Sequence, residues 1–137
     1  MSVTETRDID ACHALRRTVF IEEQGVSAEE EVDGLDDTAI HFLAELDGVQ
    51  VGTARILLKG DTAKIGRVCV LKQARGTRQG QALINACTTW ARDNGYARAV
   101  LGAQLHALGF YEGLGFTAFG PVYDDAGIDH RDMELLL

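Results

Sequence analysis

The chain has 137 residues, of which 46% are hydrophobic and 25% charged, and its formal net charge is −8 at pH 7. These values are typical of one folded domain and exclude a disordered chain. No apolar run approaches the length of about eighteen residues that a membrane-spanning helix needs. The strong negative charge argues against nucleic acid as a partner.

The three cysteines, Cys12, Cys69 and Cys87, are widely spaced and form no C-x-x-C motif. We therefore expect reduced thiols, with neither a disulfide framework nor a zinc site. The N-terminus shows no basic segment followed by an apolar stretch, so we expect no secretory signal and a cytoplasmic protein without a bound metal.

The first half of the chain predicts a helix, a loop and a β meander. Apolar residues at helical spacing predict a helix over Asp8–Gln24, with Asp8 as its cap. Residues 26–38 are acidic and interrupted by Gly34, so we expect a loop there, with 28–31 as the candidate for one short helical turn. Strands are then predicted over Phe42–Leu46, Val49–Leu58 and Lys64–Leu71, joined by turns at Asp47-Gly48 and Lys59–Asp61.

The second half predicts a parallel unit followed by a closing pair of strands. An apolar stripe predicts a helix over residues 79–95, ending at Asn94-Gly95. The apolar segment Ala97–Gly102 reads as a buried strand, parallel to 64–71 because a helix separates the two. A short helix at Leu105–Leu114 and strands at Phe116–Val122 and Asp132–Leu137 complete the chain. We expect an α/β (α+β) fold with one mixed, mostly antiparallel sheet in a single domain, 1–137.

Charges of opposite sign are segregated along the sequence. No acidic residue lies between Asp61 and Asp93, whereas residues 22–37 hold no Lys or Arg and carry eight acidic residues, namely Glu22, Glu23, Glu29, Glu30, Glu31, Asp33, Asp36 and Asp37. Each run alone is typical of a solvated face. Together they favour an anion-binding site beside an acidic region.

A basic turn joins the 64–71 strand to the helix that follows it. The free backbone N–H groups at the start of a helix can bind phosphate oxygens, and Lys72, Arg75 and Arg78 supply cations there. A P-loop is excluded because Gly80 is followed by Gln81 rather than by Lys and Ser or Thr. A dinucleotide fingerprint is excluded because its glycines are incomplete.

Two segments of the chain resemble motifs of the GNAT superfamily of acetyl-CoA-dependent N-acetyltransferases. They are Arg75-Gly76-Thr77-Arg78-Gln79-Gly80, with Arg78 at a usual glycine, and Gln104-x-x-Ala107-x-x-Phe110-Tyr111-Glu112-x-Leu114-Gly115-Phe116, with Gln104 in place of the commoner Asn. The segments Arg17–Gln24 and Asp125–His130 further resemble the small ElaA/YjcF-like branch. The resemblance implies a sheet whose central parallel pair is splayed into a V.

The resemblance also implies roles for individual residues. The cofactor pyrophosphate would be bound by Arg75, Gly76, Thr77, Arg78, Gln79, Gly80 and Gln81. Backbone groups of Val68, Cys69 and Val70 would bind the pantetheine arm and stabilise the oxyanion. Tyr111 would be the general acid for the thiolate, because a phenol and a thiol have comparable pKa values. The general base stays open between Glu23, His41 and His106, and Cys69 is expected to be a buried thiol rather than a nucleophile.

We therefore expect an N-acetyltransferase that moves an acetyl group from acetyl-CoA to an amine by direct transfer through a tetrahedral intermediate. The acceptor would be a small molecule or peptide, and the acidic segment favours a cationic one. One alternative is a non-enzymatic acyl-CoA-binding or regulatory module on the same fold. A second is an interaction domain that uses the acidic loop as its surface. No membrane partner is expected, and a homodimer is left open.

Overall fold

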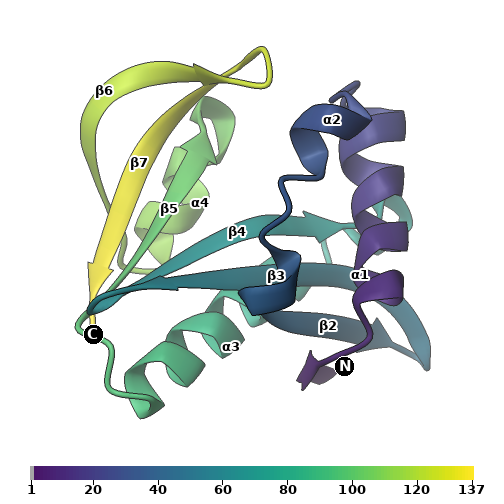
Figure 1. The fold of residues 1–137 in the computed structure, drawn as a ribbon, viewed down its shortest axis with the longest axis horizontal. Helices are drawn as coiled ribbons and strands as arrows, with labels where there is room; N and C mark the ends of the chain where they lie inside the picture. The colour runs from purple at the N-terminus through teal and green to yellow at the C-terminus, as the bar shows by residue number, and fades with distance from the viewer. Residues whose placement is uncertain (1) are drawn as a thin grey trace.

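A single seven-stranded sheet runs through the computed structural model, which describes residues 2–137 (Figure 1). Its strands lie in the order β1-β2-β3-β4-β5-β7-β6. The bounds are β1 (Ser2–Thr6), β2 (Ile40–Leu46), β3 (Val49–Lys59), β4 (Thr62–Val70), β5 (Arg98–Gln104), β6 (Thr117–Asp125) and β7 (Ile128–Leu136). Neighbouring strands pair antiparallel, except that β4 and β5 are parallel. The mixed, mostly antiparallel sheet is thereby confirmed.

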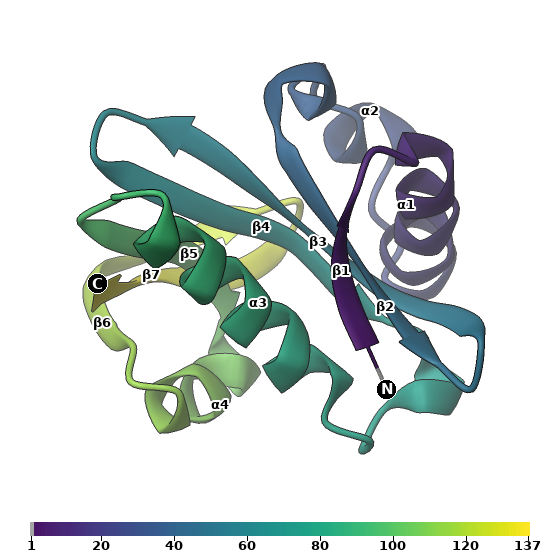
Figure 2. The same cartoon turned by 90° about the horizontal axis from the view of Figure 1, so that it is seen from below.

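Helices cover both faces of the sheet. Their bounds are α1 (Ile9–Arg16), η1 (Arg17–Glu23), α2 (Ala28–Glu31), η2 (Asp36–Thr38), η3 (Lys72–Ala74), α3 (Gln79–Asp93), η4 (Leu105–Ala107) and α4 (Leu108–Gly113). Figure 2 shows α1 and α2 on one side of β1–β4 and α3 on the other. In the region spanned by residues 2–137, no helix combines the length and the apolarity that crossing a membrane requires.

The first helix changes its type halfway along. Asp8 caps α1 as predicted, since its Oδ1 accepts a hydrogen bond from the Ala11 N–H at 3.1 Å. Beyond Arg16 the chain continues as the π-helix η1 rather than as an α-helix to Gln24. The Gln24 N–H, for example, donates to the Val19 carbonyl five residues earlier, at 3.0 Å.

Side chains of the central strands point alternately to the two faces of the sheet and pack in two hydrophobic cores. Phe42 and Ala44 of β2 pack in the cluster that contains Leu83 of α3. Leu43, between them, faces the opposite way and packs with Leu15 of α1. A strand buried on both faces reads as a continuous apolar run, and residues 42–44 have that character.

The two parallel strands diverge soon after they meet. β4 and β5 pair only over Thr62–Lys64 and Arg98–Val100. Beyond these residues β4 stays with β3, while β5 stays with β7 along its whole length. The expected V-shaped opening in the centre of the sheet is therefore present, and the second half of β4 has one unpaired edge.

A β-bulge interrupts β4 at the start of this divergence. Thr53 of β3 pairs with Cys69 and Arg55 pairs with Gly66, so Ala54 alone faces the two residues Arg67 and Val68. Arg67 has a positive φ of 51°. Bulges with one residue in the left-handed region bend a strand and occur often beside functional sites.

Two parts of the sheet differ from the sequence prediction. β1 was not predicted, because its segment SVTET holds a single apolar residue, Val3, which packs against the main core. The last two strands are longer than predicted and join in a tight turn at Ala126 and Gly127, with φ values of 54° and 78°. Alanine rarely adopts such a conformation, so the turn carried no clear sequence signal.

Candidate active site

Two joined cavities follow the opening between β4 and β5. One, the hairpin cavity, has a volume of about 410 Å³ and lies between the β6–β7 hairpin and the segment around α2. The other, the turn cavity, has a volume of about 560 Å³ and lies toward the β4–α3 turn. Both cavities are lined by the same five residues at their junction: Gln24, Val68, Gln104, His106 and Ile128.

The open edge of β4 forms one wall of the turn cavity. The Leu71 N–H donates to the Val51 carbonyl at 2.8 Å, so Leu71 directs its backbone groups toward β3. Backbone direction alternates along a strand, and the N–H and C=O of Val70 therefore face the open edge. The Val70 carbonyl indeed accepts a hydrogen bond from Arg75 Nε at 3.1 Å. The same alternation places the groups of Val68 on this edge and turns those of Cys69 toward β3.

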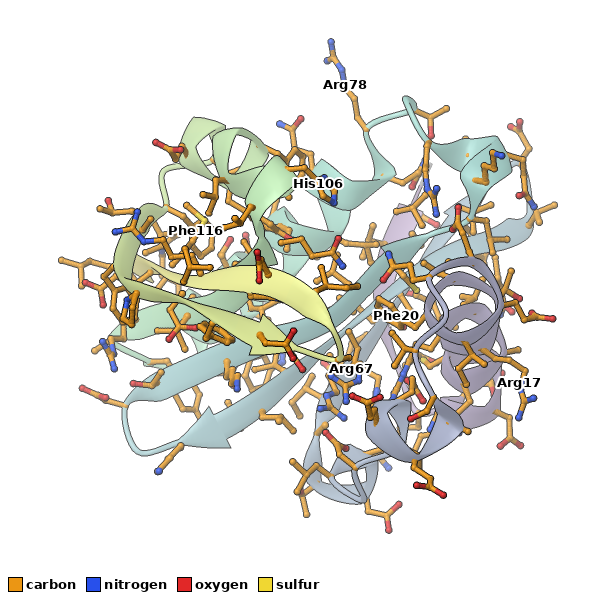
Figure 3. The ribbon with its side chains drawn as sticks, turned by 90° about the horizontal axis from the view of Figure 1, so that it is seen from above. Arg17, Phe20, Arg67, Arg78, His106 and Phe116 are labelled. Atoms are coloured by element: carbon orange, nitrogen blue, oxygen red, sulfur yellow. The ribbon has the colours of Figure 1, made fainter. Side chains whose placement is uncertain are left out.

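The β4–α3 turn is exposed to solvent. Residues 75–78 are all exposed, as is Gln81, while Gly80 is half-buried. Arg78 occupies the N-cap position of α3 with φ 65° and ψ 20°, the left-handed conformation that glycine adopts most readily. Figure 3 shows its side chain pointing away from the body of the protein. The Arg78 guanidinium therefore does not lie over the helix N-terminus.

Arg75 and Gln79 of the turn have contacts and burial that the sequence did not indicate. The Arg75 guanidinium donates to both carboxylate oxygens of Glu23, with Nη1 to Oε1 at 2.7 Å. Gln79 is only 2% exposed, and among the described residues its side-chain Nε2 and Oε1 have no hydrogen-bond partner. A ligand in the turn would thus meet the backbone of Gln79 rather than its side chain.

Tyr111 of α4 lines the hairpin cavity. Its ring packs edge-on against Phe110 and Phe116, with centroid distances of 5.0 and 6.0 Å. Burial raises the pKa of Tyr111 to about 12. The phenol therefore stays protonated at neutral pH, but its pKa no longer matches that of a thiol, as the sequence argument assumed.

Arginines from other elements form ion pairs with four of the eight acidic residues in segment 22–37. Arg16 of α1 is 1% exposed and pairs with Glu31 and with Asp36, the latter at 2.8 Å. Arg55 of β3 is 3% exposed and contacts Asp36 at 3.0 Å. Arg55 and Arg67 also pair with Asp33. These three carboxylates thus form the polar part of one cavity wall. Glu22, Glu29, Glu30 and Asp37 of the same segment stay exposed and form no ion pair within residues 2–137.

Paired arginines stabilise the charged forms of these carboxylates. Hydrogen bonding to Arg55 lowers the pKa of Asp33 to about 2. Burial opposes ionisation of Asp36, yet hydrogen bonds from Arg16, His13 and Arg55 hold its pKa well below the ordinary value. These groups are permanent anions at neutral pH and are poor proton acceptors.

The three candidate bases differ in their access to the cavities. Glu23 lines the turn cavity, but its hydrogen bonds with Arg75 lower its pKa. His41 is 4% exposed, and its Nε2 lies 2.9 Å from the Asp36 carbonyl oxygen, outside both cavities. His106 lines both cavities and contacts Gln104 Oε1 through Nε2 at 2.7 Å. Of the three, His106 alone lines a cavity without being held in an ion pair.

The β6–β7 hairpin adds residues that the sequence analysis did not assign. Tyr123 and His130 line the hairpin cavity, and their rings stack with centroids 6.0 Å apart. The Tyr123 hydroxyl donates to Asp132 at 2.7 Å. A Cβ on Gly102 would lie 2.4 Å from that hydroxyl, so the contact requires glycine there. The one available signal was the Asp125–His130 segment itself.

The cysteines behave as expected. Cys12, Cys69 and Cys87 are free and buried. Burial raises the pKa of Cys69 to about 12, which keeps the thiol protonated and unreactive. Within residues 2–137 no group of three or more His, Cys, Asp or Glu side chains is arranged to hold a metal ion.

Comparison with known proteins gives a consistent family. Residues 10–137 match the model of the acetyltransferase (GNAT) domain. The chain is 35% identical over 120 residues to "Uncharacterized N-acetyltransferase YjcF" of Bacillus subtilis, covering 87% of this chain and 86% of that protein. It is 36% identical over 128 residues to Protein ElaA of Escherichia coli, covering 87% and 81%.

Solved structures agree with this match. An acyl-CoA N-acyltransferase from Pseudomonas aeruginosa is 29% identical, with a TM-score of 0.86 over 98% of this chain and 99% of that one. An aminoglycoside 6'-N-acetyltransferase in complex with coenzyme A shares the fold, with 17% identity, a TM-score of 0.79 and coverage of 99% and 97%. From the matched domain and the curated relatives together, the chain belongs to the GNAT acetyltransferase family.

Proposed function

We propose that the protein is an N-acetyltransferase that moves an acetyl group from acetyl-CoA to an amine by direct transfer. One observation carries the proposal: β4 and β5 separate after three residue pairs and leave the edge of β4 open between an exposed turn and a cavity. The family uses acetyl-CoA, whose amide-bearing arm can add to such an edge as a further strand. The Val70 N–H, which faces this edge, is also available to stabilise an oxyanion.

The β4–α3 turn suits the diphosphate of the coenzyme. α3 is 15 residues long, and its first backbone N–H groups have no partner within the helix. Residues 75–78 are exposed in front of it, so a phosphate could approach these donors without displacing other segments. Lys72, which forms no ion pair among residues 2–137, adds a cation beside the turn.

Tyr111 is proposed to assist the departure of the thiolate. Its phenol is protonated at neutral pH because burial raises its pKa to about 12. So weak an acid does not transfer a proton ahead of bond cleavage. It can donate a hydrogen bond to the sulfur and pass a proton as the C–S bond breaks.

Amine acetylation rather than another acyl transfer is supported by the relatives. The Bacillus subtilis relative is described as an N-acetyltransferase and the Pseudomonas aeruginosa structure as an N-acyltransferase. GNAT acyltransferases act on small-molecule or peptide acceptors. Glu31, Asp33 and Asp36 are paired with arginines, so a preference for a cationic acceptor would rest on Glu30 and Asp125, which line the hairpin cavity and form no ion pair among residues 2–137.

A non-enzymatic acyl-CoA-binding module is the second candidate. It is favoured because two of the three candidate bases are not available to a substrate. Glu23 is paired with Arg75, and His41 lies outside the cavities. The interaction-domain alternative is weakened, since Glu31, Asp33 and Asp36 are engaged within the protein, although Glu22, Glu29, Glu30 and Asp37 stay exposed.

Thiol release from acetyl-CoA with a panel of amines distinguishes the two candidates. We expect amine-dependent release by the wild type, and a Tyr111→Phe variant whose kcat is about 100-fold lower with an unchanged Kd for coenzyme A. Tyr96→Phe is the matched control, because Tyr96 stacks on Trp90 away from the cavities. Coenzyme binding without amine-dependent release would favour the binding module, and absence of binding would refute both.

The coenzyme site can be tested without an acceptor. Titrating ¹⁵N-labelled protein with coenzyme A should shift the backbone amide resonances of Val68, Val70 and residues 75–81 most strongly. Shifts confined to another surface would refute the proposed site.

A further inference from the structure

We infer that His130 is the base that takes the proton from the acceptor nitrogen. The inference rests on the proposed N-acetyltransferase activity and assigns one residue within it. Three features of the structure carry it: the tautomer of the imidazole, the fixed orientation of its ring, and its position in the hairpin cavity beside the junction of the two cavities.

A backbone hydrogen bond fixes the tautomer. His130 Nδ1 lies 2.7 Å from the Ile128 carbonyl oxygen. A carbonyl oxygen only accepts hydrogen bonds, so Nδ1 carries the hydrogen and the neutral ring has its lone pair on Nε2. Among residues 2–137, Nε2 forms neither a hydrogen bond nor an ion pair. His130 therefore presents an unoccupied proton acceptor.

The surrounding residues hold the ring in place. The imidazole stacks on Tyr123 with an angle of 24° between the rings. Tyr123 is itself fixed by its hydrogen bond to Asp132, over the Gly102 position where no side chain intervenes. A base that is oriented by its neighbours loses little entropy when it meets the acceptor.

The position of His130 matches the point where donor and acceptor would meet. It lines the hairpin cavity, and its Cα partner on β5 is Gln104. Gln104 and Ile128 both belong to the junction shared with the turn cavity. An acetyl group held at the open edge of β4 would arrive at this junction from one side, and an amine in the hairpin cavity from the other.

Three carboxylates of the cavities are already engaged, whereas Glu30 and Asp125 of the hairpin cavity form no ion pair among residues 2–137. Asp33 and Glu31 are paired with arginines, and Glu23 is held by Arg75. His106 lines both cavities, but it is exposed and its recorded contact is with the flexible side chain of Gln104. His106 is thus the direct competitor of His130, and the experiment includes it.

The protons balance as follows. An acceptor ammonium gives one proton to His130 Nε2, and the freed lone pair forms the N–C bond to the acetyl carbonyl carbon. As the C–S bond breaks, the electron pair leaves with sulfur. The second nitrogen proton reaches the sulfur through the Tyr111 hydroxyl, which gives one proton and takes one. The His130 imidazolium then releases its proton to water.

Two small amines test the inference. Ethylamine and 2,2-difluoroethylamine differ little in size, but at about pH 8 the first is almost entirely protonated and the second, whose fluorines withdraw electrons, is largely neutral. We expect His130→Gln to lower kcat/KM about 100-fold or more with ethylamine and at most about tenfold with difluoroethylamine. A merely structural role would lower both values by the same factor.

The remaining variants make each outcome decisive. His130→Gln should bind coenzyme A with a Kd within about twofold of the wild type, and His13→Gln, which lies outside both cavities, should keep both rates. An equal loss for the two amines, or the amine-dependent loss in His106→Gln instead, would overturn the inference. A wild type that binds coenzyme A but acetylates no amine would refute the proposed function and this inference with it. Full wild-type activity in His130→Gln would refute the inference alone.

Discussion

Two charged regions of the chain differ in whether their charges find partners in the fold. Among the acidic residues around α2, Glu31, Asp33 and Asp36 are paired with Arg16, Arg55 and Arg67. The basic β4–α3 turn stays exposed, with Arg78 directed into solvent and Lys72 unpaired within the described chain. A run of like charges creates a field only where no partner from a distant segment reaches it. Within the basic turn, Lys72 and Arg78 meet that condition, whereas Arg75 is paired with Glu23. Within the acidic segment, Glu31, Asp33 and Asp36 do not meet it.

Breaking the buried network should have the largest effect. Asp36→Ala leaves Arg16 and Arg55, which are 1% and 3% exposed, without a shared partner. We expect the free energy of unfolding to fall by about 3–5 kcal/mol. Asp37→Ala, at the exposed neighbouring residue, should change it by less than about 0.5 kcal/mol. Urea denaturation followed by Trp90 fluorescence measures both, and equal losses would contradict the proposed difference between buried and exposed acids.

Acid should lower the free energy of unfolding by protonating Asp33 in the same cavity wall. Its pKa is lowered from 3.8 to about 2 by Arg55, so the folded state favours the carboxylate and gains stability above pH 3.8 that is lost as the pH falls toward 2. The stability advantage of the wild type over Asp33→Asn should be about 1–2 kcal/mol near neutrality and shrink through that window. Urea denaturation at a series of pH values measures the advantage. A difference that stays constant with pH would mean that the ion pairs contribute nothing.

The exposed region should respond in ligand affinity more than in stability. Glu23→Gln removes the carboxylate that neutralises Arg75. We expect the Kd for coenzyme A to fall about threefold at low salt and the gain to shrink at high salt. Calorimetry at two ionic strengths checks this, with Glu22→Gln as the control. Weaker binding by Glu23→Gln would show that the ion pair shapes the site.

Arg78 should give the smallest effect. Arg78→Gly relieves a left-handed conformation but adds chain entropy to the unfolded state, so we expect a stabilisation of at most about 1 kcal/mol. The coenzyme affinity should change less than about twofold, because the side chain projects away from the turn. Thermal unfolding and calorimetry of Arg78→Gly and Arg78→Ala separate backbone from side-chain effects. A tenfold loss of affinity in both variants would place the guanidinium on the ligand.

The sequence predicted the elements whose signals are local. Asp8 caps α1, the apolar stripe forms α3, and the helix between 64–71 and 97–102 makes β4 and β5 parallel. It could not predict the π-helical turn after Arg16 or the β1 edge, since neither depends on a local pattern. The turn at 75–80 was located by its glycines and cations, whereas its one buried member, Gln79, was not distinguishable from its neighbours.

The candidate site was only partly accessible from sequence. The motif around Tyr111 placed that residue in the cavity wall, but its pKa follows from burial that the sequence does not display. The roles of Glu23 and His41 depended on partners 52 and 5 residues away in the chain, Arg75 and Asp36. The arrangement of Tyr123, Asp132 and Gly102 needs three strands in register.

The bulge at Arg67 reverses which side chains of β4 face each side of the sheet. Ile65 packs in the core that contains α3, whereas Cys69, four residues later, packs with α1 on the opposite face. An uninterrupted strand would send residues four apart to the same side. Deleting one residue here would leave the composition of β4 almost unaltered. The side chains after the bulge would then have to exchange faces of the sheet, or else the backbone N–H groups after the bulge would have to point to the other edge of the strand. The number of residues in β4 therefore determines which side chains face each core as much as the residue types do.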